Sequence, residues 1–140
     1  MSEERWEHFS HEADLGIRGY GKTVADAFAQ GAIAMSAAIT DPSTVRAENA
    51  VRIRCKSTDL ELLFTDWLNA LIYEMAVRRM LFCRFDVVVD GTQLKATAWG
   101  EAMDRSRHEP AVEVKGATYT ALCVRRQKNG IWLAQCVIDV

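Results

Sequence analysis

The sequence predicts an α+β fold, a single two-layer domain in which two long helices pack against a mixed, mostly antiparallel β-sheet. Two segments carry apolar residues at helical spacing, and most of the remaining chain alternates as strands or hairpins. The 140 residues are 49% hydrophobic and 26% charged, which is the balance of a globular protein. A chain of this length can bury one adequate core, so we expect one domain over residues 1–140.

The N-terminal part is expected to form two short strands and then a helix. Residues 6–10 and 16–20 flank the polar segment SHEADLG, in which Gly16 permits an unusual turn. Thr23 offers a hydroxyl that can cap the first turn of a helix. That helix is expected to end at Asp41-Pro42, because the residue before a proline is pushed out of the α region.

The middle of the chain predicts a strand followed by a long helix. Residues 45–55 alternate between apolar and mostly polar side chains. Thr58-Asp59-Leu60-Glu61 has the pattern of a capping box with Thr58 as the N-cap. The following LLFTDWLNALIYEMAVRR carries a broad apolar stripe and ends in two arginines, which suit a helix C-terminus. We expect the stripe to pack on the sheet; a groove for a binding partner is the alternative.

Two hairpins are expected in the last third of the chain. Residues 81–89 meet 93–99 through Asp90-Gly91, a type I′ turn signal. Residues 117–125 meet 131–138 through Lys128-Asn129-Gly130. The polar segment AMDRSRHEPAVE between these hairpins is predicted to be a mobile loop.

Charge and hydropathy argue against several classes of function and location. The net charge of -2 and pI near 5.9 argue against a general nucleic-acid binder, which needs a basic face, although a local basic patch stays open. We expect tRNA binding to be weak or indirect, with modest contacts from Arg105, Arg107 and His108. No apolar run approaches the length of a membrane span, and the charged N-terminus is unlike a secretory signal. We expect a cytoplasmic protein.

The four cysteines are Cys55, Cys83, Cys123 and Cys136, and no two form a CxxC pair. Their apolar, strand-like surroundings favour buried thiols in a reducing compartment over a disulfide framework. A zinc site is the alternative.

Few motifs of catalysis are present. The chain has no GxSxG elbow, no HExxH and no phosphate-binding glycine loop. Ser10 and His11 with Asp14 suggest a nucleophile and base, but neighbouring residues on a strand point to opposite faces.

Carboxylates at the two ends of the chain suggest a cation site. Asp14, Asp139 and the oxygens of Val140 would form an all-oxygen set, which hard divalent cations prefer and calcium tolerates in irregular geometry. The alternative is that Asp14 forms an Asx turn and Asp139 is a solvated end.

The sequence resembles the archease family over nearly its whole length. HEADLGIRGYGKTVADAF is similar to the family's opening signature, and the similarity continues through DLELLFTDWLNALIYE, LFCRFDV and GEAMDRSRHEPAVEVKGATYT. It closes with W-x-A-x-C-V-I-D-V at the C-terminus.

The resemblance implies an accessory protein rather than an enzyme. Archeases assist the RtcB-type tRNA-splicing RNA ligase, which joins RNA ends using GTP and a divalent metal, in forming its guanylated intermediate and turning over repeatedly. The family binds a divalent cation, calcium with manganese or magnesium as alternatives. The matching ligand positions are Asp14, Asp139 and Val140.

Two positions depart from the family pattern. Glu12 stands where members commonly have Thr, and Thr120 replaces the His of a TYH motif.

Two other functions stay open. A metal-dependent hydrolase would use the two aspartates, Asp14 and Asp139, with His11 or Asp41. A chaperone-like binding module would present a groove beside the helix that contains Trp67.

Overall fold

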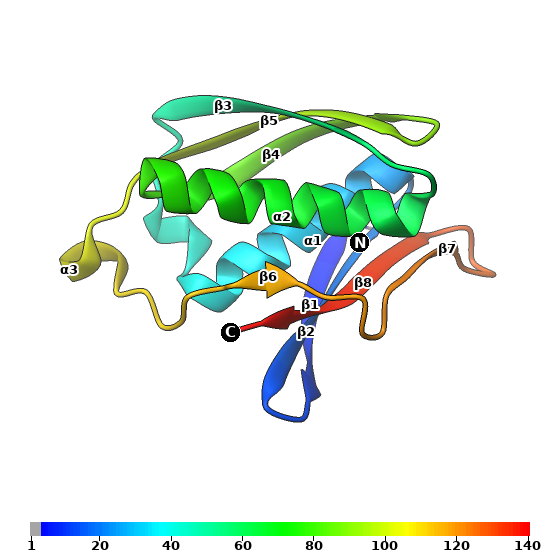
Figure 1. Cartoon of the computed structure of the whole chain (residues 1–140), viewed down its shortest axis with the longest axis horizontal. Helices are drawn as coiled ribbons and strands as arrows, with labels where there is room; N and C mark the ends of the chain where they lie inside the picture. The colour runs from blue at the N-terminus through cyan, green and yellow to red at the C-terminus, as the bar shows by residue number, and fades with distance from the viewer. Residues whose placement is uncertain (1–3) are drawn as a thin grey trace.

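The computed structural model describes residues 4–140, in which the long helices lie between two β-sheets (Figure 1). The helices are α1 (Val24–Ile39), α2 (Leu60–Arg78) and the short α3 (Arg105–His108), with a 3-10 turn η1 at Pro42–Thr44. The strands are β1 (Arg5–His11), β2 (Asp14–Gly21), β3 (Asn49–Lys56), β4 (Met80–Asp90), β5 (Gln93–Ala102), β6 (Gly116–Ala117), β7 (Cys123–Arg126) and β8 (Trp132–Asp139).

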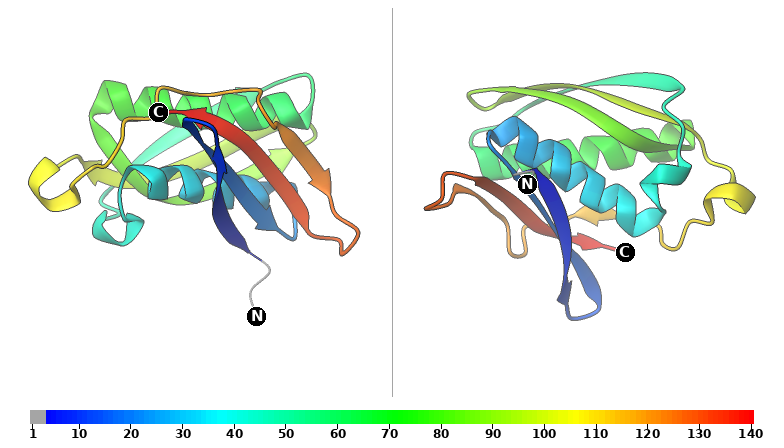
Figure 2. Two further views of the ribbon diagram at one scale, coloured as in Figure 1. Left: turned by 90° about the horizontal axis from the view of Figure 1, so that it is seen from below. Right: turned by 180° about the vertical axis from the view of Figure 1, so that it is seen from behind.

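The strands divide into a five-stranded sheet, called sheet A, and a three-stranded sheet B. Sheet A has the order β1-β2-β8-β6, with β7 also pairing with β8, and sheet B has the order β3-β5-β4. The predicted α+β class with two long helices is confirmed. The single mixed sheet of the prediction is replaced by two sheets whose described pairs are all antiparallel. The reason is that β8 returns to β2, so the terminal strands pair together and leave β3, β4 and β5 to form their own sheet (Figure 2).

Helix α1 packs closely against β2 and α2 because a glycine at each contact, Gly19 and Gly31, lacks a side chain. A Cβ at Gly19 would lie 2.2 Å from the carbonyl oxygen of Ala27, and one at Gly31 would lie 2.7 Å from the ring of Phe64. The Trp67 indole of α2 donates a 3.0 Å hydrogen bond to a carbonyl of α1, that of Phe28. The core therefore joins both helices to both sheets.

The helix starts follow capping chemistry, with one correction to the prediction. Thr23 caps α1 as expected, its hydroxyl accepting from the Asp26 N–H at 3.1 Å. The N-cap of α2 is Asp59, whose carboxylate accepts from the Leu62 N–H at 2.8 Å. The prediction of Thr58 was one residue too early, because the helix begins at Leu60 and Asp59 supplies the acceptor that the first turn needs.

Two predicted turns and one predicted strand differ in detail from the structure. The β4–β5 turn is Gly91-Thr92, and a positive φ at Gly91 alone fits type II′ rather than type I′. In the β1–β2 hairpin the left-handed residue is Glu12, while Gly16 lies inside β2 under the Phe9 ring. The expected strand 117–125 is interrupted after β6 and resumes only at β7.

Among residues 4–140, no helix is both long and apolar enough to cross a membrane.

Candidate functional site

The register of sheet A aligns the carboxylates that the sequence analysis singled out. Strands β2 and β8 pair from Gly21↔Trp132 to Leu15↔Ile138. One further step of this register sets Asp14 opposite Asp139. Directly opposed residues of antiparallel strands project from the same face, with Cβ atoms about 4.5–5.5 Å apart. The two aspartates, at opposite ends of the sequence, are therefore neighbours at one end of sheet A.

The end of β8 is held on its other side by the segment that leads into β6. Gly116 pairs with Asp139, and the Lys115 N–H donates to the Asp139 carbonyl at 2.8 Å. The Val140 side chain packs against the core. The backbone at the C-terminus is therefore fixed beside both carboxylates. The sequence analysis did not single out Lys115, although the VK pair lay within the segment it compared with the archeases.

These residues fit a hard divalent cation in donor chemistry. Asp14 is half-buried and Asp139 exposed, so both carboxylates can meet an ion from solvent. Between residues 4 and 140, no group of three or more His, Cys, Asp or Glu side chains is arranged to hold a metal. A site here would consequently combine two carboxylates with backbone oxygens, which is a ligand set that calcium accepts.

The residues of the catalytic alternatives are not all brought together. His11 lies opposite Asp14 on the same face, whereas Ser10 lies opposite Leu15 and faces the other way, as the strand alternation predicted. Asp41 instead caps η1, accepting from the Ser43 N–H and hydroxyl at 3.0 and 2.8 Å. The groove that contains Asp41 includes neither Asp14 nor Asp139.

The predicted mobile loop 102–113 contains α3, and two of its residues bind a buried carboxylate, that of Glu101. Glu101 is only 5% exposed; its carboxylate accepts from the Arg107 guanidinium at 2.5 Å and the Arg46 N–H at 2.6 Å. The hydrogen bonds from Arg107 and Arg46 lower the pKa of Glu101 to about 2. His108 Nδ1 accepts from the Asp104 N–H, so Nε2 carries the proton and donates to Glu101 at 3.1 Å. Two of the three loop residues expected to contact RNA are thus engaged inside the protein.

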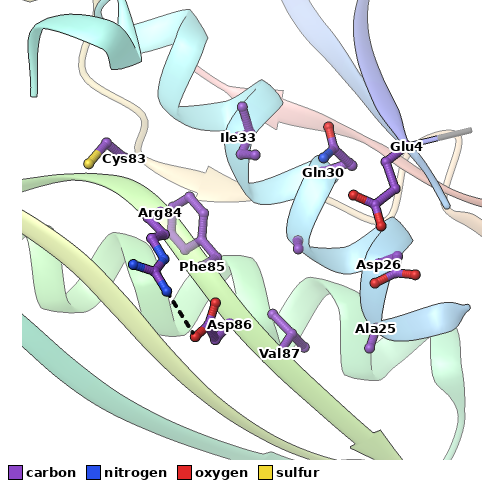
Figure 3. A pocket seen from close by; sticks show the side chains of 11 residues that line it. Glu4, Ala25, Asp26, Gln30, Ile33, Cys83, Arg84, Phe85, Asp86 and Val87 are labelled. Atoms are coloured by element: carbon purple, nitrogen blue, oxygen red, sulfur yellow. Dashed lines mark ion pairs between the residues drawn. The ribbon is translucent and has the colours of Figure 1, made fainter. Parts of the chain in front are cut away.

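A groove runs between α1 and the edge strand β4 (Figure 3). One wall is a stripe of α1 that includes Ala29 and Ile33, and the other is the run 83–87 of β4. Arg84 points along the strand to Asp86, with 3.5 Å between charged atoms. This groove contains none of the predicted metal ligands.

The four cysteines are free thiols. Burial raises the pKa of Cys136 to about 12 and also raises the pKa values of Cys55 and Cys83. Only Cys136 is fully buried; the other three are half-buried. Within residues 4–140, no cysteine belongs to a group of three or more metal-ligating side chains.

Known proteins similar to this chain share one family. A model of the archease protein family (MTH1598/TM1083) matches residues 6–140. The protein archease of Pyrococcus abyssi is 36% identical over 141 residues, covering 98% of this chain and 99% of the relative. That of Sulfurisphaera tokodaii is 32% identical over 139 residues, covering 98% and 99%.

Two solved structures have the same fold. The solution structure of Methanobacterium thermoautotrophicum protein 1598 superposes with a TM-score of 0.83 at 28% identity, covering 96% of this chain and 98% of that one. A crystal structure from Thermotoga maritima, described as an archease and possible chaperone, gives a TM-score of 0.61 at 18% identity, covering 96% of each chain. The family match over nearly all residues and the relatives above 30% identity show that this chain belongs to the archease family.

Proposed function

We propose that this protein is an accessory factor of an RtcB-type RNA ligase, and that it holds a divalent cation, calcium by preference, through Asp14, Asp139 and Val140. Membership of the archease family supports an accessory role. The description of the Thermotoga maritima relative as a possible chaperone supports action on a protein partner. The observation that carries the cation assignment is the β2–β8 register, which sets the two aspartates opposite each other.

Each residue has a defined task in this proposal. Asp14 and Asp139 supply anionic oxygens from neighbouring strands, and the pairing of Asp139 with Gly116 prevents the end of β8 from fraying. A bound cation would neutralise these charges and present a positive centre to a partner protein. Glu12, where the family commonly has Thr, adds a further carboxylate in the β1–β2 turn and favours a cation more strongly.

A metal-dependent hydrolase is less well supported. It needs a substrate pocket beside the metal, and the two grooves described above contain neither Asp14 nor Asp139. His11 is the one additional side chain of that alternative which shares their face.

The test is a ligation assay with an RtcB-type ligase, GTP and excess RNA, with and without this protein. We expect repeated turnover by the ligase only when the protein is present, and loss of that stimulation in Asp14→Asn. Glu113→Gln, which neutralises an exposed carboxylate outside sheet B, is the matched control. Stimulation that survives Asp14→Asn in full would reject the cation site, and the absence of any stimulation would reject the ligase as partner. Release of product from phosphoester substrates without ligase would instead support the hydrolase.

A further inference from the structure

Sheet B has one face that no helix covers. In Figure 1 it forms the upper layer, with α1 and α2 on its lower side only. Alternate residues of its strands, such as Ile53, Ala98 and Phe85, are buried toward the helices. The intervening residues within 52–56, 84–90 and 93–99 project outward, and these residues define the face discussed here. Farther along the sheet, Leu81 and Glu101 are buried and do not belong to it.

The outward face is strongly basic although the protein as a whole is acidic. The face carries five cations and two carboxylates, a net charge of +3, against -2 for the entire chain. The cations are Arg52, Arg54, Lys56, Arg84 and Lys95, and the carboxylates are Asp86 and Asp90. The net charge of the whole chain does not reveal this basic face, because most of the acidic residues lie elsewhere on the protein.

The arrangement of these cations destabilises the folded protein. Arg54 and Lys95 are paired directly across β3 and β5, and like charges so placed destabilise a sheet. Within residues 4–140, neither side chain, nor that of Arg52 or Lys56, has a hydrogen bond or an ion pair. Arg84 alone among the five cations has a counterion on this face, Asp86 at 3.5 Å. The other four cations are instead suited to an external anion.

An aromatic residue lies at one end of the same face. Trp99 is half-buried and pairs with Arg84, whose guanidinium stacks 4.5 Å from its ring centre. Arg52 and Arg54 follow each other at alternate positions of β3, about 6.6 Å apart along the strand. Cations in a row beside an aromatic and guanidinium stack are the elements with which proteins bind single-stranded nucleic acid.

We propose that the outward face of sheet B binds the backbone of single-stranded RNA without sequence preference. Val88 is the one exposed large apolar residue on this face, so the face lacks the apolar centre that anchors protein partners. A flat sheet face also does not fit the grooves of a duplex, which admit a helix or a narrow ribbon. Affinity would be modest and strongly dependent on salt, consistent with the weak tRNA binding expected from the net charge.

Fluorescence anisotropy with a labelled oligouridylate of about 12 nucleotides tests this proposal. The full-length protein is titrated alone, without ligase or divalent cation, so the outcome is independent of the proposed ligase function. The test variant is Arg52→Gln, Arg54→Gln and Lys95→Gln combined. The matched control removes three exposed cations elsewhere, by Arg125→Gln, Arg126→Gln and Lys128→Gln.

At 50 mM salt we expect the wild type to bind and the test variant to bind at least about tenfold more weakly, with the control nearly unchanged. The slope of log affinity against log salt should fall by about 2, since each phosphate contact on a single strand contributes about 0.7. Trp99→Leu should weaken binding while leaving that slope unchanged, because stacking releases no counterions.

Three results would overturn the proposal: no binding by the wild type at 50 mM salt, equal losses in the test and control variants, or normal RNA binding by the test variant. If the last were accompanied by lost stimulation of the ligase, the face would be a docking surface for an acidic protein.

Discussion

At the scale of single residues, the position of a carboxylate determines whether it stabilises the fold or repels a neighbour. Glu101 lies among hydrogen-bond donors of Arg107, Arg46 and His108. Asp14 and Asp139, by contrast, are set opposite each other by the register of sheet A. The first carboxylate is compensated within the protein. For the second pair we propose a cation from outside, and the two cases lead to different predictions.

Asp14→Asn is expected to lower calcium affinity by about tenfold or more, equivalent to about 1.4 kcal/mol, because it removes one of two anionic ligands. Without calcium its melting temperature should equal or slightly exceed that of the wild type, since a like-charge contact is relieved. Titration calorimetry and melting curves with calcium and with a chelator measure both effects, and Asp90→Asn is the control. Equal calcium affinity in Asp14→Asn and the wild type would remove Asp14 from the site.

Glu101→Gln is expected to lower the melting temperature at pH 7, and the difference should shrink in acid. The pKa of Glu101 is depressed to about 2 from an ordinary value of 4.5. A depressed pKa contributes stability that is present above the ordinary value and is lost as pH falls through the folded one. The wild type therefore loses this contribution between about pH 4.5 and 2, whereas the variant has none to lose.

Melting curves of both proteins from pH 7 to pH 2 check this expectation, with Glu113→Gln as an exposed control. A difference in melting temperature that stays constant over this range would mean that the Glu101 charge does not stabilise the protein.

At the scale of elements, local chemistry sets where each helix begins. The α2 N-cap is Asp59, and Thr58 lies just outside the helix. Gly19 and Gly31 similarly determine how closely α1 approaches β2 and α2. Each of these contacts involves one or two residues, so single substitutions can measure how much each contact contributes to stability.

Asp59→Ala is expected to destabilise the protein by about 1 kcal/mol, because the Leu62 N–H loses its acceptor. Thr58→Ala should change stability by no more than about 0.5 kcal/mol, as is usual for exposed positions. Urea denaturation of the two variants, next to the wild type, compares the neighbouring positions directly. A larger loss in Thr58→Ala would restore the capping box that the sequence suggested.

At the scale of the whole molecule, local signals in the sequence predicted the helices, although the N-cap of α2 and the type of the β4–β5 turn were wrong. The long-range pairing of strands was not predicted. The helical stripe and the Thr23 cap depend on residues close in sequence, and both predictions are confirmed. The division into two sheets depends on β2 meeting β8 across more than a hundred residues, which periodicity does not encode. The Glu101 cluster was missed for the same reason, because a polar segment gives no sign that His108 will be buried.

The carboxylates of Asp14 and Asp139 suggested the candidate cation site, and the family resemblance supplied the reason to prefer it. The spacing of the carboxylates by itself favoured an Asx turn at Asp14 and a solvated end at Asp139, since nothing in it shows that the two meet. Continuing the β2–β8 register by one step beyond Leu15↔Ile138 supports that proximity. Cation binding itself remains a prediction, to be tested by measurement.

Extending the chain beyond Val140 is expected to damage cation binding and ligase stimulation far more than a tag before Met1. An appended peptide turns the terminal carboxylate into a neutral amide and directs the chain past the two aspartates. Calcium titration and the ligation assay on both tagged proteins test this, and melting curves verify that β8 remains paired. A C-terminally extended protein with full calcium affinity would show that Val140 is not a ligand, since termini ordinarily tolerate extension.

The place of β8 in sheet A also sets an order of events during synthesis. Strands β3, β4 and β5 are neighbours in space and leave the ribosome together, so sheet B and both helices can assemble while translation continues. Strand β2 must wait for β8, which follows it by more than a hundred residues, before Asp14 acquires its neighbour. A nascent chain therefore has no complete pair of carboxylates until β8 has been made, and the capacity to capture a cation would arise only when both strands are present.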